Sequence, residues 1–149
     1  MSEDNIFVAG LAIFFFIALW YVINKEYKDR SGTDLKHIID VLCYVESDNG
    51  ANLDHAGDEL GILGIRPIMV DEVNRVGKES FTYNDRKSEI MSRRMCGIFL
   101  THQIMWYIGK YNRIPTEYMI VSSWHTGSIV SPVDTKYIKR YIECKKRLI

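Results

Sequence analysis

The sequence has few cysteines and no excess of charge of either sign. Its three cysteines, Cys43, Cys96 and Cys144, are far apart and odd in number, so they indicate neither a disulfide framework nor a CxxC metal motif. We expect them to be small apolar residues within helices. The formal net charge is zero, which argues against nucleic acid as a partner. The sequence also lacks internal repeats, low-complexity segments and almost all of the alternating pattern that is typical of strands.

Hydrophobic residues make up 47% of the 149 residues and charged residues 26%, proportions that suit one packed domain. One apolar run, 6–23, contains no charge and no proline. As a helix it would be about 27 Å long, close to the roughly 30 Å of the hydrocarbon core of a bilayer. Trp20 and Tyr21 lie near its end, where amphipathic aromatic side chains favour the membrane interface. We predict a short polar N-terminus over 1–5, a transmembrane helix over 6–23 and a polar linker over 24–33.

Two other interpretations of the run 6–23 are a cleaved signal peptide and a buried core helix. A signal peptide needs a basic start and a small-residue cleavage site, but this start carries Glu3 and Asp4. All 19 basic residues of the chain follow Asn24, and the part of the chain after Asn24 carries a net charge of +2. Because basic residues follow the run, the positive-inside rule would leave the following domain in the cytoplasm.

The chain from residue 34 to 149 is expected to be one all-α domain with a loop-rich insertion after its first helix. Apolar periodicity and capping residues predict helices over about 34–46, 67–77, 86–111, 115–127 and from 134 or 135 onward. The expected N-cap of the long helix is Asp85, and its buried side should carry Ile90, Met91, Met95, Ile98, Phe99 and Met105. Arg93 and Arg94 are expected on a solvated face of the same helix.

Glu46 continues the apolar stripe of the first predicted helix, which consists of Leu35, Ile38, Ile39 and Leu42. It stands where that helix ends and a segment rich in Asp, Asn and Gly begins. A carboxyl group against apolar side chains loses solvation, which raises its pKa. A neutral carboxylic acid near pH 7 is what the protonation of a glycosidic oxygen requires. Glu46 is therefore either a general acid of this kind or a solvated residue at a fraying helix end.

Five segments resemble, in order, motifs of the lytic transglycosylase and goose-type lysozyme group. Val45-Glu46-Ser47 looks like the V-E-S-G-G signature, in which the Glu ends a helix and is the single catalytic acid. Residues 61–67 are similar to the G-x-x-Q-I-x-P turn of this group. Residues 70–76 and 81–86 resemble the V-D-D-V-N-R-I and Y-T-x-x-D-R segments of one branch, and 123–127 falls where that branch has I-W-N-G-G. The resemblance covers nearly all of the chain after the linker.

The resemblance implies a lysozyme-like helical fold and cleavage of the β-1,4 bond between N-acetylmuramic acid and N-acetylglucosamine in peptidoglycan. Glu46 would be the catalytic acid, and Tyr137 falls where the family often has a tyrosine near the acid. Substrate contacts are expected from Ser47, Gly64, Ile65, Trp124, His125 and Tyr137. The expected partners are the glycan strands and, through the run 6–23, the lipid bilayer. Such an enzyme would be anchored in a virion membrane or in a bacterial inner membrane facing the wall, and it would open the wall locally for phage entry or lysis.

No metal or other cofactor is predicted. The pair His37 and His55 has no third ligand at a suitable spacing. The sequence departs from the family at Gly64, which replaces the glutamine of G-x-x-Q, and at His125, which replaces the asparagine of N-G-G.

Three interpretations of the activity stay open. If Glu46 takes a proton from the 6-hydroxyl of the sugar, the product is a 1,6-anhydro ring, as the resemblance favours. If the proton comes from water, the reaction is lysozyme-type hydrolysis, and an inverting hydrolysis needs a second carboxylate. The candidates for that group follow Glu46 in the loop: Asp48, Asp54, Asp58 and Glu59. The third interpretation is a membrane-tethered protein that holds glycan without cleaving it or serves as a structural virion or envelope protein.

Overall fold

The structure is a computed structural model that describes residues 34–55 and 57–148. This part of the chain contains five α-helices, one 3₁₀ helix and no strand, although Leu60 and Ile65 form an isolated bridge. The expected all-α class is therefore confirmed for the described residues. The elements are α2 (Leu35–Ser47), α3 (Pro67–Gly77), η1 (Tyr83–Lys87), α4 (Glu89–Tyr111), α5 (Glu117–Thr126) and α6 (Thr135–Lys146).

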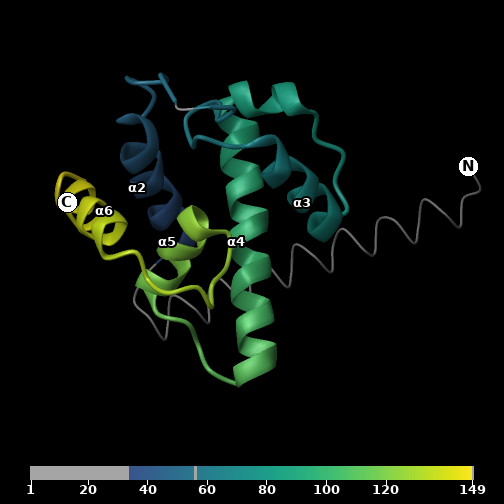
Figure 1. The fold of residues 1–149 in the computed structure, drawn as a ribbon, viewed down its shortest axis with the longest axis vertical. Helices are drawn as coiled ribbons and strands as arrows, with labels where there is room; N and C mark the ends of the chain where they lie inside the picture. The colour runs from purple at the N-terminus through teal and green to yellow at the C-terminus, as the bar shows by residue number, and fades with distance from the viewer. Residues whose placement is uncertain (1–33, 56, 149) are drawn as a thin grey trace, which may run out of the picture. The chain divides into compact units, whose positions relative to one another are not determined.

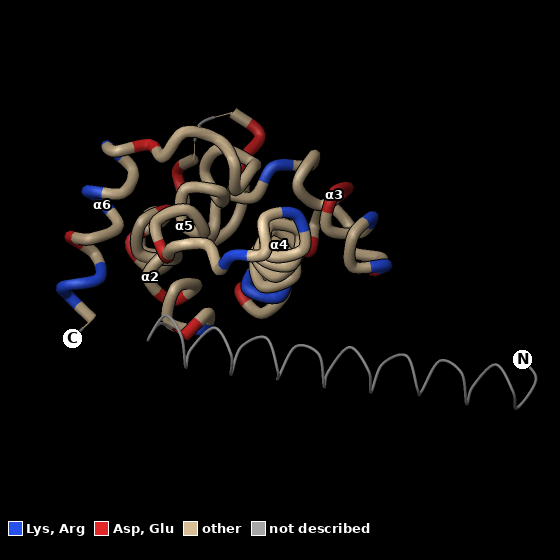
Figure 2. The backbone as a smooth tube through the Cα atoms, turned by 90° about the horizontal axis from the view of Figure 1, so that it is seen from below, with Lys and Arg blue, Asp and Glu red and all other residues tan. Residues whose placement is uncertain are grey.

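Helix α4 forms the centre of the domain (Figure 1). It contacts α2, α3, α5 and η1, while α6 packs against α2 and α5. Figure 1 shows α3 on one side of α4 and α2, α5 and α6 on the other. The core between these helices contains the buried side chains of Leu42, Phe99, Ile120 and Tyr141. Figure 2 looks from below and shows that α2, α3, α4 and α6 each carry both acidic and basic residues, whereas α5 carries only Glu117.

Local capping signals place most helix ends. Pro67 occupies the first turn of α3, as predicted, because its missing N–H has no partner to lose there. The carboxylate of Asp134 accepts hydrogen bonds from the backbone N–H groups at the start of α6, so Asp134 is the cap that the sequence indicated. Helix α5 begins after Thr116 rather than at Pro115, and its end at Gly127, which adopts a left-handed conformation, agrees with the prediction.

The helix predicted over 86–111 with Asp85 as its N-cap is wrong at its start, because two elements occupy this stretch. Asp85 lies inside η1, where its carboxylate accepts from the backbone N–H of Thr82 and closes a short turn. Ser88 then has an extended conformation, which ends η1, and its side chain accepts from the N–H of Met91. Ser88 is therefore the N-cap of α4.

The predicted buried side of α4 is correct only in the middle of the helix. Met95 and Phe99 are buried, whereas Ile90 is 76% exposed and Met105 is 39% exposed. The last buried residue of α4 is Ile104. The other helices cover only the central part of α4, so apolar residues near its ends have no neighbours to bury them.

The three cysteines lie within α2, α4 and α6 and are buried, which confirms the prediction. Burial raises the pKa of the Cys43 thiol to about 11, so it stays protonated at neutral pH. In the described part of the chain these cysteines behave as small apolar core residues.

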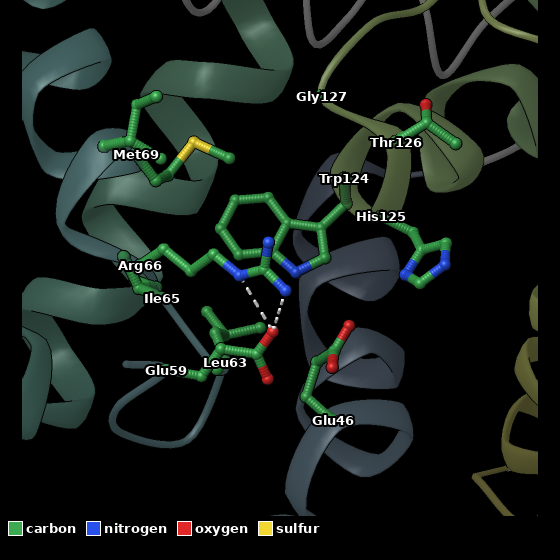
Figure 3. Close-up of a pocket in the computed structure, with 12 residues that line it drawn as sticks. Glu46, Glu59, Leu63, Ile65, Arg66, Met69, Trp124, His125, Thr126 and Gly127 are labelled. Atoms are coloured by element: carbon green, nitrogen blue, oxygen red, sulfur yellow. Dashed lines mark hydrogen bonds and ion pairs between the residues drawn. The ribbon is translucent and has the colours of Figure 1, made fainter. Parts of the chain in front are cut away.

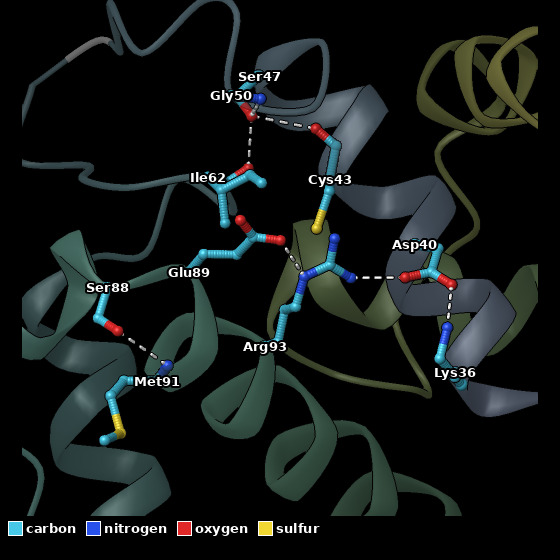
Figure 4. A network of polar contacts seen from close by, with 10 residues as sticks. All are labelled: Lys36, Asp40, Cys43, Ser47, Gly50, Ile62, Ser88, Glu89, Met91 and Arg93. Atoms are coloured by element: carbon cyan, nitrogen blue, oxygen red, sulfur yellow. Dashed lines mark hydrogen bonds and ion pairs between the residues drawn. The ribbon is translucent and has the colours of Figure 1, made fainter.

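A polar network fastens α2 to α4 (Figure 4). Arg93 was expected on a solvated face, but its side chain is only 28% exposed and bonds Asp40 at 2.6 Å and Glu89 at 2.8 Å. Lys36 also bonds Asp40 at 2.8 Å. Burial raises the pKa of Asp40, but the hydrogen bonds from Lys36 and Arg93 outweigh that effect and leave the pKa below its usual value. The ionised network fixes α2, the helix that carries Glu46 in its last turn.

Among the residues that the structure describes, no helix is both long enough and apolar enough to cross a membrane. The transmembrane helix predicted over 6–23 lies outside the described residues, as do the predicted N-terminus over 1–5 and the linker over 24–33.

Candidate active site

Glu46 lies in the last turn of α2, one turn after the fully buried Leu42. Its side chain is half-buried, and its carboxyl group faces a cleft (Figure 3). The prediction that Glu46 continues the buried stripe and ends the helix is confirmed, apart from one further helical residue. The carboxyl group is therefore partly withdrawn from solvent by the packing of its own helix.

The cleft has a volume of about 240 Å³ and is formed by three segments that are far apart in the sequence. Helix α2 supplies Glu46, the end of α5 supplies residues 124–127, and the loop before α3 supplies the remaining wall together with Ile68 and Met69. In the view of Figure 3, the indole of Trp124 lies between Arg66 on one side and His125 on the other. The cleft depends on how these three segments pack together, because none of them encloses it alone.

Ser47, predicted as a substrate contact, is buried and does not line the cleft. Its hydroxyl oxygen is buried, 2.8 Å from the carbonyl oxygen of Ile62 and 3.1 Å from that of Cys43, and it accepts from the N–H of Gly50. Successive residues of a helix point about 100° apart, so Glu46 and Ser47 cannot both face the cleft. Ser47 instead fastens the start of the following loop.

Arg86 holds the loop that forms one wall of the cleft. Its guanidinium group donates to the carbonyl oxygens of Asp58 at 2.7 Å and Ile65 at 2.9 Å. Gly61 passes over the backbone of Arg86 with a φ of +79°, and a Cβ atom at this position would lie 1.8 Å from the carbonyl oxygen of Arg86. Only glycine fits this approach, and the wall is thereby fixed relative to η1.

Tyr137 holds the carboxyl group of Glu46, and His125 supports the ring of Tyr137. The hydroxyl of Tyr137, in α6, donates a hydrogen bond to Oε1 of Glu46. The ring of His125, in α5, stacks on the ring of Tyr137 with centroids 4.5 Å apart and planes 12° apart. Nε2 of His125 lies 3.3 Å from a carboxylate oxygen of Asp134, which caps α6. The packing of three helices therefore orients the acid.

Burial raises the pKa of Glu46 above its usual value. The hydrogen bond from Tyr137 and the nearby imidazole of His125 oppose this effect without cancelling it. Burial beside Glu46 also raises the pKa of Tyr137 well above its usual value, so its phenol keeps its proton and remains a donor at neutral pH. Glu46 therefore stays neutral to a higher pH than a solvated glutamate, as a general acid requires.

Gly64 and Ile65, two of the predicted substrate contacts, both line the cleft. Gly64 has a φ of +57°, and a Cβ atom there would lie 3.4 Å from the ring of His55 and 3.6 Å from Oε2 of Glu46. Nε2 of His55 lies 2.6 Å from the carbonyl oxygen of Gly61, which places the ring against this turn. These are ordinary van der Waals distances, so the left-handed backbone conformation, and not a lack of space, is what favours glycine at position 64.

Glu59 is the second carboxylate of the cleft. Asp48, Asp54 and Asp58 are exposed and do not line it, whereas Glu59 does. Nε and Nη2 of Arg66 both donate to Oε1 of Glu59, at 3.0 and 2.8 Å (Figure 3). Sequence reasoning missed Arg66 as a residue of the site, because a polar residue in a loop carries no periodic signal.

The remaining predicted substrate contacts are Trp124, His125 and Tyr137, and only the first two line the cleft. Trp124 is only 6% exposed and packs edge-on against Phe99 with centroids 5.8 Å apart, so it belongs to both the core and the cleft. Tyr137 is not a lining residue and meets the cleft through its hydrogen bond to Glu46.

Over residues 34–55 and 57–148, no three His, Cys, Asp or Glu side chains are grouped so that they could hold a metal ion. No protein-family model, curated protein or solved structure matches the chain. The motifs of the sequence and the geometry of the cleft are therefore the basis for assigning a function.

Proposed function

We propose that the chain is a membrane-anchored lytic transglycosylase with a lysozyme-like helical domain. It cleaves the β-1,4 bond between N-acetylmuramic acid and N-acetylglucosamine in peptidoglycan, with Glu46 as its single catalytic acid. The observation that carries the proposal is the carboxyl group of Glu46, which faces a cleft, is half-buried, has a raised pKa and is held by Tyr137. The run 6–23 anchors the enzyme, on a virion membrane or on an inner membrane facing the wall, for local opening of the wall.

In the proposed reaction, protonated Glu46 donates its proton to the glycosidic oxygen. The bond between this oxygen and C1 of the muramic sugar breaks, and positive charge develops at C1. The leaving N-acetylglucosamine carries the transferred proton away as a hydroxyl group. Glu46, now a carboxylate, takes the proton of the 6-hydroxyl of the muramic sugar as that oxygen attacks C1. The product is a 1,6-anhydro ring, and Glu46 is protonated again.

The other residues of the cleft have supporting parts in this proposal. Tyr137 orients the carboxyl group and stabilises its ionised form by donating to it. Trp124 offers apolar surface to a sugar face. Ile65 lines the cleft but is only 1% exposed, so it supports the wall rather than covering a sugar. His125 occupies the position of the family's asparagine and offers a ring nitrogen to the substrate, with its ring held by Tyr137 and Asp134.

Hydrolysis of the same bond is the second candidate, and Glu59 is the observation that favours it. An inverting hydrolase needs a carboxylate on the opposite side of the sugar to activate water. Glu59 lines the same cleft and is held by Arg66 through one of its two oxygens, Oε1.

The experiment uses the full chain in detergent, incubated with purified peptidoglycan, with the released sugars identified by mass spectrometry. The variants are Glu46→Gln and Glu59→Gln, and the matched control is Glu143→Gln, an exposed glutamate of α6 outside the cleft. We expect anhydro-muropeptides from the wild type, Glu59→Gln and Glu143→Gln, and no product from Glu46→Gln.

Other outcomes separate the alternatives. Products with reducing ends that disappear in Glu59→Gln would replace the transglycosylase with a hydrolase that uses two carboxylates. No product from a folded wild type, under conditions in which a control enzyme works, would refute catalysis. The chain would then be a membrane-tethered module that holds glycan, or a structural virion or envelope protein.

A further inference from the structure

The C-terminal end of α4 extends beyond the packed domain. After Ile104, the last buried residue of this helix, α4 continues to Tyr111 without another buried side chain. This stretch, residues 105–111, is called the α4 overhang and is about 10 Å long. Figure 1 shows the lower end of α4 projecting past α2, α3 and α5. The overhang is therefore a helix end in which the described part of the chain fully covers no side chain.

The α4 overhang has the composition of a membrane interface. Trp106 is 40% exposed, Tyr111 is 43% exposed and Met105 is 39% exposed. Tyr107 packs on Tyr111 with ring centroids 4.8 Å apart, and Nζ of Lys110 lies 4.7 Å from the ring centroid of Trp106. Trp and Tyr rings favour the depth of the lipid headgroups, and lysine can extend its charge from an apolar stem to the same level. An exposed apolar end of this kind is unfavourable in water.

The position of the chain's apolar run identifies the occupant of this surface. The run 6–23 ends shortly before the domain, and the linker over 24–33 can span at most about 35 Å when fully extended. A domain tethered at this length stays close to the bilayer, so a second contact with it gains from a high local concentration. Arg113 lies two residues after the overhang and adds a positive charge that suits anionic headgroups.

We propose that the α4 overhang inserts into the interface of the same bilayer that the run 6–23 anchors to. The inference rests on the membrane anchoring in the proposed function and does not depend on catalysis. In Figure 1 the overhang and the loop 48–66, which supplies Glu59 and Arg66 to the cleft, lie toward opposite ends of α4. Contact between the overhang and the bilayer directs that loop away from the membrane, which is the orientation needed to reach a wall polymer.

The experiment measures the depth of Trp106 in the membrane. The chain has 3 tryptophans, Trp20, Trp106 and Trp124. The full chain with Trp20→Phe is reconstituted into vesicles of phosphatidylethanolamine and phosphatidylglycerol that contain lipids brominated near the start of the acyl chains. Bromine quenches an indole only at close range, and Trp124 is 6% exposed within the domain. We expect the brominated lipid to quench the emission of one of the two remaining tryptophans, and this quenching to disappear when Trp106→Phe is added.

Flotation of the wild type with the vesicles is measured first. A chain that does not float with the vesicles would refute both the membrane anchor and this inference. A chain that floats while Trp106 is quenched by iodide in water, and not by brominated lipid, would refute this inference and leave the anchor intact. Protection of Trp106 from both quenchers would show that protein covers the overhang, which also overturns the inference. Because Trp106 is exposed, its replacement is not expected to unfold the domain.

Discussion

Replacing Tyr137 with phenylalanine tests the proposed role of Glu46 most directly. The change removes the hydroxyl that donates to Oε1 of Glu46 and keeps the ring that stacks on His125. A hydrogen bond to a charged group stabilises it by about 1.5–3 kcal/mol. Since about 1.4 kcal/mol corresponds to a tenfold change in an equilibrium constant, the ratio of neutral to ionised Glu46 at a fixed pH should rise by about 10- to 150-fold.

The sign of the effect follows from which form the hydrogen bond favours. Tyr137 donates, so it favours the carboxylate and lowers the pKa that burial has raised. Its loss should therefore raise the pKa of Glu46 further. A general acid acts while it is protonated, so the alkaline limb of the pH–rate profile should move to higher pH in Tyr137→Phe.

Initial rates of muropeptide release, measured against pH, check this prediction. Tyr141→Phe is the matched control, because this tyrosine of α6 is buried and donates to Glu117 at 2.7 Å, away from the cleft. Its alkaline limb should coincide with that of the wild type. Carbon-13 NMR titration of the glutamate carboxyl groups reports the pKa of Glu46 without any need for activity. A pKa that falls or stays constant in Tyr137→Phe would refute the electrostatic reasoning about the site.

Three further predictions concern the stability of the chain in detergent. Gly61→Ala should lower the free energy of unfolding by about 3 kcal/mol or more, since the new Cβ would overlap a backbone carbonyl oxygen. Gly109→Ala, at a helical glycine with open space around it, is the control, and a similar loss in both variants would contradict the steric argument. Arg86→Met should cost about 3 kcal/mol, because buried carbonyl oxygens lose their donor; urea unfolding that detects less than about 1 kcal/mol would contradict this role. Glu46→Gln should raise the melting temperature more at a pH of about 8 than at about 4. The raised pKa of Glu46 means that the folded state disfavours the carboxylate, and this destabilisation exists only at pH values above the usual pKa of glutamate. An equal change at both pH values would show that charge is not the cause.

The sequence by itself determined the features that depend on neighbours within one or two turns. The spacing of Leu42 and Glu46 placed the carboxyl group on the buried side of its helix, and the structure agrees. Pro67 and Asp134 marked the starts of two helices, because a missing N–H and a capping carboxylate act locally. The all-α class followed from the same periodicity.

The tertiary structure alone decided which of these residues meet. Tyr137 and Glu46 are 91 residues apart, and the resemblance implied that they were close, but only the packing of α6 against α2 brings them into contact. Glu59 became the cleft's second carboxylate because Arg86 fixes its loop, a contact that spans 28 residues at Asp58. Local patterns could not predict these pairs, because the free energy of a distant contact depends on the packing of whole helices.

The exposed end of α4 is another feature in which local sequence and tertiary packing had different roles. Its sequence is apolar, and periodicity predicted that Met105 would be buried with Met95 and Phe99. Whether an apolar residue is buried depends on whether another element covers it, and in the described part of the chain no residue of α4 beyond Ile104 is fully covered. The sequence determined the apolar character of this helix end, and the tertiary structure decided that it faces outward.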